Sequence, residues 1–237
     1  MDSNFQSTIN NYMPLIIELR QRLLIVFGVF VSFLAIGAFF YEWIIGGFIG
    51  LVEIKGVNLI FSSPFEFMNL SLTCGTVLAT ITTLPVIIFQ VVDFLKPAIS
   101  KKEMHILRTF VPFSIILFIG GFVVGFFIMK QVILLSYETS RGLNIGGYIN
   151  VSELLTIILL TSAMMGVSFQ FPIVLTILVR YGILSVKMLK KQRMGAYIIS
   201  VIFASLMPPT DLLSLVLLTI PLVFLFELML ILNRNYK

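Results

Sequence analysis

The sequence has very few residues of the kinds that bind metals or act as nucleophiles. Among its 237 residues there is one cysteine, Cys74, and one histidine, His105. A single cysteine cannot form an intramolecular disulfide, and these two residues cannot supply a Cys/His metal site. They also argue against Ser-His or Cys-His catalysis, because the required residue types are almost absent. We therefore expect no metal, no cofactor and no enzymatic activity.

Charged residues are also scarce. They make up 11% of the chain, whereas 59% of the residues are hydrophobic and the mean hydropathy is +1.08. This composition excludes a soluble globular protein. About six helical spans of about 20 residues each would accommodate most of the hydrophobic residues. We predict an all-α, polytopic membrane protein.

Six apolar segments follow one another along the chain. The fifth covers about 13 residues, or about 20 Å as a helix, and is too short to cross a hydrocarbon core of about 30 Å unaided. The sequence Pro208-Pro209-Thr210-Asp211 after it favours a tight hairpin over one continuous helix. We expect residues 1–237 to form a single membrane domain with spans at about 23–45, 67–95, 109–135, 154–179, 195–207 and 212–232.

Lysine and arginine are distributed unevenly between successive loops. Thirteen of them lie before the first segment, after the last, or near residues 100 and 187, whereas the intervening loops hold only Lys55 and Arg141. The positive-inside rule places the loops rich in lysine and arginine in the cytosol, together with both termini. This orientation requires an even number of spans, and six satisfies it.

Local signals mark helix starts and bends. Ser63-Pro64-Phe65-Glu66 forms a capping box with proline in the first helical position, in which Glu66 would accept a hydrogen bond from the backbone N–H of Ser63. Residues 100–103 have the same form, and residues 150–153 a looser one. Four prolines lie inside apolar segments, where they favour bends and hence a concave wall: Pro85, Pro112, Pro172 and Pro221.

Two polar residues inside the apolar segments need an explanation. Glu227 lies in the last segment, where an unpaired ionisable group costs about 2 to 3 kcal/mol or more, so it is a functional candidate. Alternatively it lies near the cytosolic surface, seven residues before Arg234, and points towards the headgroups. Gln170 lies in the fourth segment and either forms an interhelical hydrogen bond of roughly 0.6 to 2 kcal/mol or faces a cavity.

Acidic residues are few on the expected cytosolic side. They are Asp2, Glu18 and Glu103, with Asp93 at the inner end of the second segment. A cationic partner would have to bind these carboxylates. The simpler interpretation of Glu18 is an ion pair with Arg22 one helical turn later, worth about 0.3 to 0.5 kcal/mol, and that of Glu103 is the capping box.

Six motifs occur in order along almost the whole chain. They lie at residues 17–23, 63–67, 96–103, 165–172 and 208–211, and at residues 220–221 together with 226–227. Each motif alone is weak, but six in order on a six-span framework are specific. The chain resembles the TatC family, the multi-pass receptor subunit of the twin-arginine protein translocase.

The resemblance implies a glove-shaped bundle of six helices with both termini in the cytosol. Such a protein recognises signal peptides with two consecutive arginines and helps to move folded proteins across the membrane, driven by a proton gradient. Glu18, Arg20 and Glu103 match the family's signal-peptide site. Carboxylates bind guanidinium groups bidentately and lysine cannot reproduce that geometry, so two separated carboxylates could recognise two arginines.

The resemblance also implies partners and a location. Gln170 matches a polar position thought to meet a polar group of a partner's transmembrane helix, although many bacterial members carry glutamate there. We treat Glu227 as a second candidate of this kind, and Pro64, Glu66, Pro209 and Asp211 as structural residues of the outer face. The expected partners are TatA/TatB-type single-span subunits, further copies of the chain and the lipid bilayer, but not nucleic acid. The expected location is the bacterial cytoplasmic membrane, or a thylakoid or other organellar inner membrane.

The polar residues in the apolar segments also allow two other classes of function. A secondary transporter of a small solute or ion could use Gln170, Glu227 and the proline-containing helices to line a midplane site, although the sequence has no internal repeat. An intramembrane hydrolase would need a serine with a base, or paired aspartates, in the membrane, and only Asp93 and Asp211 could serve. We expect those two residues at opposite membrane faces.

Overall fold

The computed structural model describes residues 2–52, 58–60, 62–95, 101–142, 148–180, 182 and 184–234; within these ranges the side chains of residues 2–12, 14, 15, 49, 52, 58, 59, 92, 94, 95, 101–111, 141, 148 and 149 lie outside the described part. The described chain is almost entirely helical. Its elements are α1 (Asp2–Phe39), α2 (Tyr41–Val52), β1 (Asn58–Ile60), α3 (Glu66–Leu95), α4 (Lys101–Gly142), β2 (Tyr148–Asn150), α5 (Val151–Ser168), α6 (Phe171–Arg180), α7 (Val186–Lys191), α8 (Arg193–Ser205) and α9 (Leu212–Leu232).

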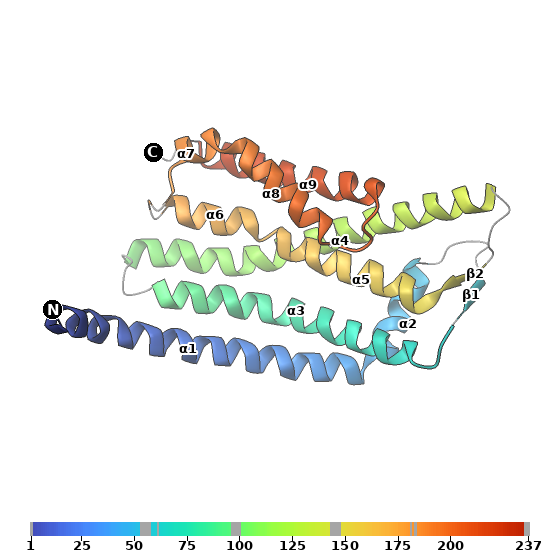
Figure 1. Ribbon diagram of the computed structural model, residues 1–237, viewed down its shortest axis with the longest axis horizontal. Helices are drawn as coiled ribbons and strands as arrows, with labels where there is room; N and C mark the ends of the chain where they lie inside the picture. The colour runs from blue at the N-terminus through green and yellow to red at the C-terminus, as the bar shows by residue number, and fades with distance from the viewer. Residues whose placement is uncertain are drawn as a thin grey trace.

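Five described segments are long and apolar enough to cross a membrane. They are Ile16–Phe39, Glu66–Val91, Pro112–Ser140, Val151–Arg180 and Leu212–Leu232. The apolar helix α8 has only 13 residues, as expected for the fifth segment. The long helices run side by side along the molecule, and the two described chain ends lie at the same end of the bundle (Figure 1). The prediction of an all-α, multi-span membrane protein is confirmed.

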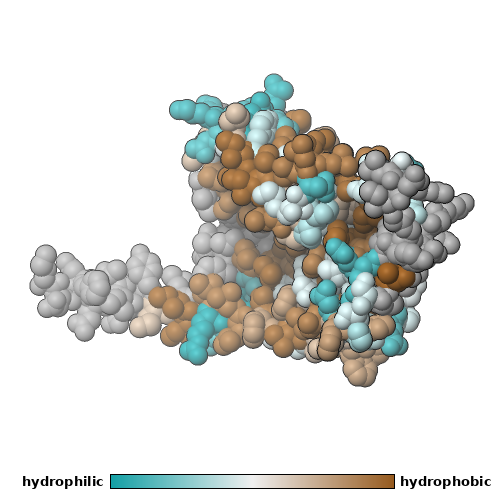
Figure 2. Space-filling view, turned by 45° about the vertical axis from the view of Figure 1, so that its right-hand side comes forward, coloured by the Kyte–Doolittle hydropathy of each residue, from teal (hydrophilic) through white to brown (hydrophobic). Residues whose placement is uncertain are grey.

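The outside of the bundle is strongly apolar. Phe39 and Trp43 are 81% and 83% exposed, which is favourable in lipid but would leave a large hydrophobic surface in water. Figure 2 shows hydrophobic side chains over much of the visible face, which is hollowed near its centre. This shape agrees with the expected concave bundle.

Glycines allow α1 and α3 to pack closely. A Cβ atom on Gly75 would lie 2.4 Å from the carbonyl oxygen of Leu34, and one on Gly37 would lie 2.8 Å from the Cα atom of Gly75. The hydroxyl of Ser71 also donates to the carbonyl of Ala38 at 2.7 Å. Small residues and interhelical hydrogen bonds are the usual means of joining helices in membranes. They fix the position of α1 along α3.

The first helix differs from the span expected at residues 23–45. α1 begins at Asp2 and ends at Phe39, and the chain turns at Phe40 before α2 begins. The side chain of Ile45 is buried in the core formed by α3, α4 and α5, and the ammonium group of Lys130 donates to the carbonyl of Leu51 at 2.7 Å. Packing with distant residues therefore redirects the chain directly before Tyr41 and Glu42, inside the segment expected to form one span.

The fourth segment is interrupted just before Pro172, where the sequence predicts a bend within one helix. α5 ends at Ser168, residues 169–170 form a turn, and α6 begins one residue before Pro172. The helices α3, α4 and α9 in contrast continue through Pro85, Pro112 and Pro221. The interruption places Gln170 between two helices rather than within one.

Candidate functional site

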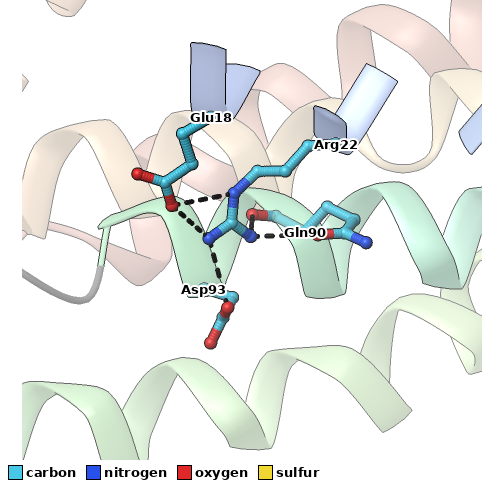
Figure 3. A network of polar contacts seen from close by, with 4 residues as sticks. All are labelled: Glu18, Arg22, Gln90 and Asp93. Atoms are coloured by element: carbon cyan, nitrogen blue, oxygen red, sulfur yellow. Dashed lines mark hydrogen bonds and ion pairs between the residues drawn. The ribbon is translucent and has the colours of Figure 1, made fainter. Parts of the chain in front are cut away.

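An arginine joins two carboxylates where α1 meets the last turns of α3. The guanidinium of Arg22 donates to Glu18 Oε1 from Nε at 3.1 Å and from Nη2 at 2.5 Å. Its Nη1 donates to the carbonyl oxygen and the Oε1 of Gln90 at 3.0 and 2.9 Å, and Nη2 lies 3.2 Å from Asp93 Oδ2. These four residues, Glu18, Arg22, Gln90 and Asp93, are called the Arg22 cluster below (Figure 3).

The Arg22 cluster arises from helical spacing on both elements. Glu18 and Arg22 are four residues apart on α1, and Gln90 and Asp93 are three apart on α3, so each pair lies on one helix face. The ion pair of Glu18 with Arg22, which was the simpler interpretation of Glu18, is present. The part played by Gln90 and Asp93, about 70 residues away, was not predicted. The side chain of Arg22 is 15% exposed, whereas those of Glu18 and Asp93 are 40% and 31% exposed. The carboxylates are thus accessible while the guanidinium is largely covered.

Only one of the two carboxylate oxygens of Glu18 accepts hydrogen bonds from the described residues. Both contacts from Arg22 go to Oε1, and Glu18 Oε2 accepts no hydrogen bond from the residues that the structure describes. A carboxylate offers about four acceptor positions, so a second charge-assisted donor could bind Oε2. Figure 3 shows this oxygen pointing away from Arg22.

The structure describes the side chain of Arg20 but not that of Glu103. Arg20 is exposed on α1 and forms no hydrogen bond or ion pair with the described part of the chain. Glu103 lies in the first turn of α4, but its side chain and the preceding residues 96–100, with the predicted capping box, lie outside the described residues. The pairing of Glu18 with Glu103 in one site therefore stays a prediction.

Gln170 joins α4 to the interruption of the fourth segment. It is 7% exposed, and its Nε2 donates to the carbonyl of Ser114 at 2.9 Å. Its Oε1 is buried and accepts no hydrogen bond from the described residues. Gln170 therefore forms the interhelical hydrogen bond of the first interpretation and still carries one unused acceptor.

Glu227 is paired rather than isolated in the last helix. Its Oε1 accepts a hydrogen bond from the hydroxyl of Tyr197 at 2.6 Å, and its Oε2 lies 3.0 Å from Nη2 of Arg193. Both partners belong to α8, so this carboxylate ties α9 to the start of α8. Neither partner was predicted, because the contact depends on how two helices pack. No contact in the described residues joins Glu227 to Gln170.

A second polar junction lies at the other end of α3, beside the short parallel strands. There Asn58, Leu59 and Ile60 of β1 pair with Tyr148, Ile149 and Asn150 of β2. The carboxylate of Glu66 accepts hydrogen bonds from Asn150 Nδ2 at 2.6 Å and from the backbone N–H of Ser62 at 3.1 Å. The hydroxyl of Ser152 donates to the Glu66 carbonyl at 3.1 Å. Ser62, Glu66, Asn150 and Ser152 are called the Glu66 junction below.

The capping predictions at this end are partly confirmed. Asn150 caps α5 by accepting a hydrogen bond from the backbone N–H of Glu153 at 3.1 Å. The prediction for α3 is wrong in detail, because Pro64 lies in the turn before the helix and Glu66 bonds Ser62 rather than Ser63. The extra turn lengthens the entry to the helix, so the carboxylate reaches the N–H group one residue earlier.

The predicted hairpin before the last helix is present. Asp211 caps α9 and accepts hydrogen bonds from the backbone N–H of Ser214 at 2.8 Å and from its hydroxyl at 2.5 Å. Partial burial acts to raise the pKa of Asp211, but these hydrogen bonds outweigh it and the net shift is downward. The carbonyl of Pro208 accepts a hydrogen bond from the hydroxyl of Thr161, which holds the residues before Pro209 against α5.

Together these features define an integral membrane protein with polar clusters at its helix ends, whose accessible carboxylates could bind a cationic ligand. Within the described residues no group of three or more His, Cys, Asp or Glu side chains could hold a metal ion. The model of the family described as Sec-independent protein translocase protein (TatC) matches residues 14–221. The chain belongs to the TatC family and is a component of the Sec-independent protein translocase.

Individual relatives agree with this assignment. The chain is similar to the Sec-independent protein translocase protein TatCy of Bacillus subtilis (strain 168), at 32% identity over 92% of this chain and 87% of the relative. It is 30% identical to TatC of Rickettsia prowazekii (strain Madrid E) over 90% of this chain and 88% of the relative. A crystal structure of the twin arginine translocase receptor TatC in DDM superposes with a TM-score of 0.78 at 26% identity, over 92% of this chain and 98% of that one.

Proposed function

We propose that the chain binds twin-arginine signal peptides through Glu18, with Arg20 and Glu103 in the same site. The observation that carries this proposal is the accessible Glu18 carboxylate, which is 40% exposed and whose Oε2 atom accepts no hydrogen bond from the described residues. A guanidinium of the peptide could bind there with charge-assisted hydrogen bonds. Glu103 is the expected acceptor for the second arginine, and Arg20 would repel cationic peptides that lack the matching geometry.

The proposed site faces the cytosol. The described chain ends lie at one end of the bundle, as do the last turns of α3 and the first turns of α4 (Figure 1), and the segments rich in lysine and arginine adjoin these elements in the sequence. With α8 as a short sixth crossing, an even number of spans places both termini on the cytosolic side. The host membrane is proposed to be the bacterial cytoplasmic membrane, or a thylakoid or other organellar inner membrane, and residues 1–237 to form one membrane domain.

The chain is proposed to act with partners rather than as an enzyme. A polar group on a single-span TatA/TatB-type helix could donate to the buried Oε1 of Gln170, which has no partner in the described structure. Such a bond is worth about 1 kcal/mol in a membrane. The working complex would contain several copies of the chain together with these subunits.

The transporter alternative is not supported. It needed Gln170 and Glu227 to line one midplane site, but Gln170 bonds Ser114 of α4 and Glu227 pairs with Arg193 of α8. The family match also names a protein translocase.

The test is binding of a labelled twin-arginine signal peptide to the full chain in nanodiscs, beside a peptide with both arginines changed to lysine. We expect the arginine peptide to bind more tightly, and the substitution Glu18→Gln to weaken it at least tenfold. Glu138→Gln, at an exposed acid on α4, is the control that removes the same charge elsewhere. Equal binding of the two peptides, or an unaffected Glu18→Gln variant, would contradict the proposal.

A further inference from the structure

We propose that Arg22 is an internal competitor of the signal peptide, and that Asp93 and Gln90 hold its guanidinium when a peptide arginine replaces it on Glu18. This inference rests on the proposed function, because it concerns the same carboxylate. It assigns roles to three residues outside the predicted binding set. Arg22 and Asp93 are positioning residues here, since they act on the peptide through Glu18.

The resting contacts of Arg22 match such an exchange. The Arg22 guanidinium directs Nε and Nη2 to Glu18 Oε1, the same kind of contact that a peptide arginine would make. A peptide could first bind the free Oε2 of Glu18 and then take over Oε1. Binding would thus begin without breaking the internal pair, which makes displacement stepwise rather than all at once.

Arg22 would keep polar partners after leaving Glu18. Its Nη1 still donates to the carbonyl and side chain of Gln90, and its Nη2 still faces Asp93 Oδ2. The displaced guanidinium therefore does not become a buried charge without a partner, a situation that would cost several kcal/mol. The exchange is feasible because α3 supplies a second set of acceptors beside the first.

Asp93 should favour the displaced state. In the resting state it shares the guanidinium with Glu18 and makes the longest contact of the cluster, 3.2 Å. In the displaced state it is the one carboxylate of the cluster that still neutralises Arg22. An interaction that is stronger in one state shifts the equilibrium towards that state. Removing the charge of Asp93 therefore holds Arg22 on Glu18.

The competition has a quantitative signature. If only the fraction of molecules with Glu18 released can bind fully, the apparent Kd of every peptide is raised by the same factor. Arg22 then lowers the affinity of the site for every peptide, whereas the preference for arginine over lysine comes from Glu18 itself. A variant without Arg22 should bind both peptides more tightly and keep their affinity ratio.

The experiment measures the Kd of both peptides for the full chain in nanodiscs. Arg22→Gln should tighten the arginine peptide about three- to fivefold, the range expected for loss of a partly exposed ion pair. Asp93→Asn should weaken it about two- to threefold. In the double variant the Asp93 substitution should have no further effect, because it acts only through Arg22.

Controls separate exchange from net charge and from folding. Lys191→Gln removes an exposed positive charge from α7 and should leave the Kd within about twofold of the unmodified chain. Arg22→Lys keeps the charge and most of the stem but cannot make the paired contacts, and should give a smaller gain than Arg22→Gln. A purely structural role would weaken binding in both single variants. That result, or a gain in Lys191→Gln equal to that in Arg22→Gln, would overturn the proposal.

The two proposals fail in different ways. If the unmodified chain and Arg22→Gln bind neither peptide, the proposed function fails and this inference falls with it. If the unmodified chain prefers the arginine peptide but the Arg22 and Asp93 variants do not shift its Kd in opposite directions, only the internal competitor is refuted. An Asp93→Asn effect that persists without Arg22 would show that Asp93 contacts the peptide directly, and would also refute it.

Discussion

The two ends of α3 both carry a carboxylate, but they hold it in different ways. In the Glu66 junction the donors are a backbone N–H and the amide of Asn150, which are uncharged groups close to the backbone. In the Arg22 cluster, Glu18 and Asp93 share a charged group at the end of a long side chain. Short neutral donors fix the entry to a helix, whereas an arginine can change partners with little backbone movement.

The largest expected effect comes from disturbing the close packing of α1 on α3, which positions the Arg22 cluster but does not involve the Glu66 junction. Gly75→Ala would place a Cβ atom 2.4 Å from the carbonyl oxygen of Leu34, which is backbone and can move only if α1 moves with it. We expect the free energy of unfolding to fall by about 1 to 3 kcal/mol. Peptide binding should fall as well, because α1 must shift along α3 and carry Arg22 away from Asp93.

The control for this prediction is Gly28→Ala, where a Cβ atom would meet nothing within 4 Å. Both variants are compared by thermal unfolding in detergent and by peptide binding. If Gly75→Ala were as stable as Gly28→Ala, the close packing of α1 on α3 would not be what positions the cluster.

The second prediction contrasts the two carboxylates directly. Glu66→Ala removes the acceptor of two donors, and we expect a loss of about 1 to 2 kcal/mol in unfolding free energy. Glu18→Ala removes an accessible ion pair and should cost less than about 1 kcal/mol. Peptide binding should show the reverse order. Thermal unfolding and peptide titration of both variants test this, and a Glu18→Ala variant less stable than Glu66→Ala would contradict it.

Local patterns were enough to predict most of the fold. The short fifth segment, the Asn150 cap and the ion pair of Glu18 with Arg22 all depend on residues within one or two helical turns. The bend expected at Pro172 is local in the same way, although the structure has an interruption there. The sequence did not predict contacts between distant helices. Asp93 beside Arg22, and Arg193 beside Glu227, become neighbours only when helices pack. The turn at Phe40 belongs to the same group, since it accompanies the packing of Ile45 against α3, α4 and α5.

Asp211 is a third carboxylate, held by uncharged donors. It tests whether such a contact makes the stability of the fold depend on pH. Hydrogen bonds from Ser214 hold the pKa of Asp211 below its usual value, despite partial burial that acts to raise it. The ionised form therefore stabilises the fold above the unfolded pKa of about 3.9, and this contribution is lost as the pH falls through the lower pKa of the folded state.

Asp211→Asn should keep most of the cap, because asparagine also accepts from the backbone N–H of the third residue of a helix. We expect a loss below about 0.5 kcal/mol at pH 7, and a difference from the unmodified chain that shrinks towards zero between pH 5 and pH 3. Thermal unfolding in detergent across that range measures the difference, with Glu138→Gln as the exposed control. A difference that stayed constant with pH would mean that the ionised carboxylate adds nothing beyond its shape. The neutral donors would then stabilise the cap through hydrogen-bond geometry alone. The charge of a carboxylate would affect stability or binding only where an arginine can exchange, as in the Arg22 cluster.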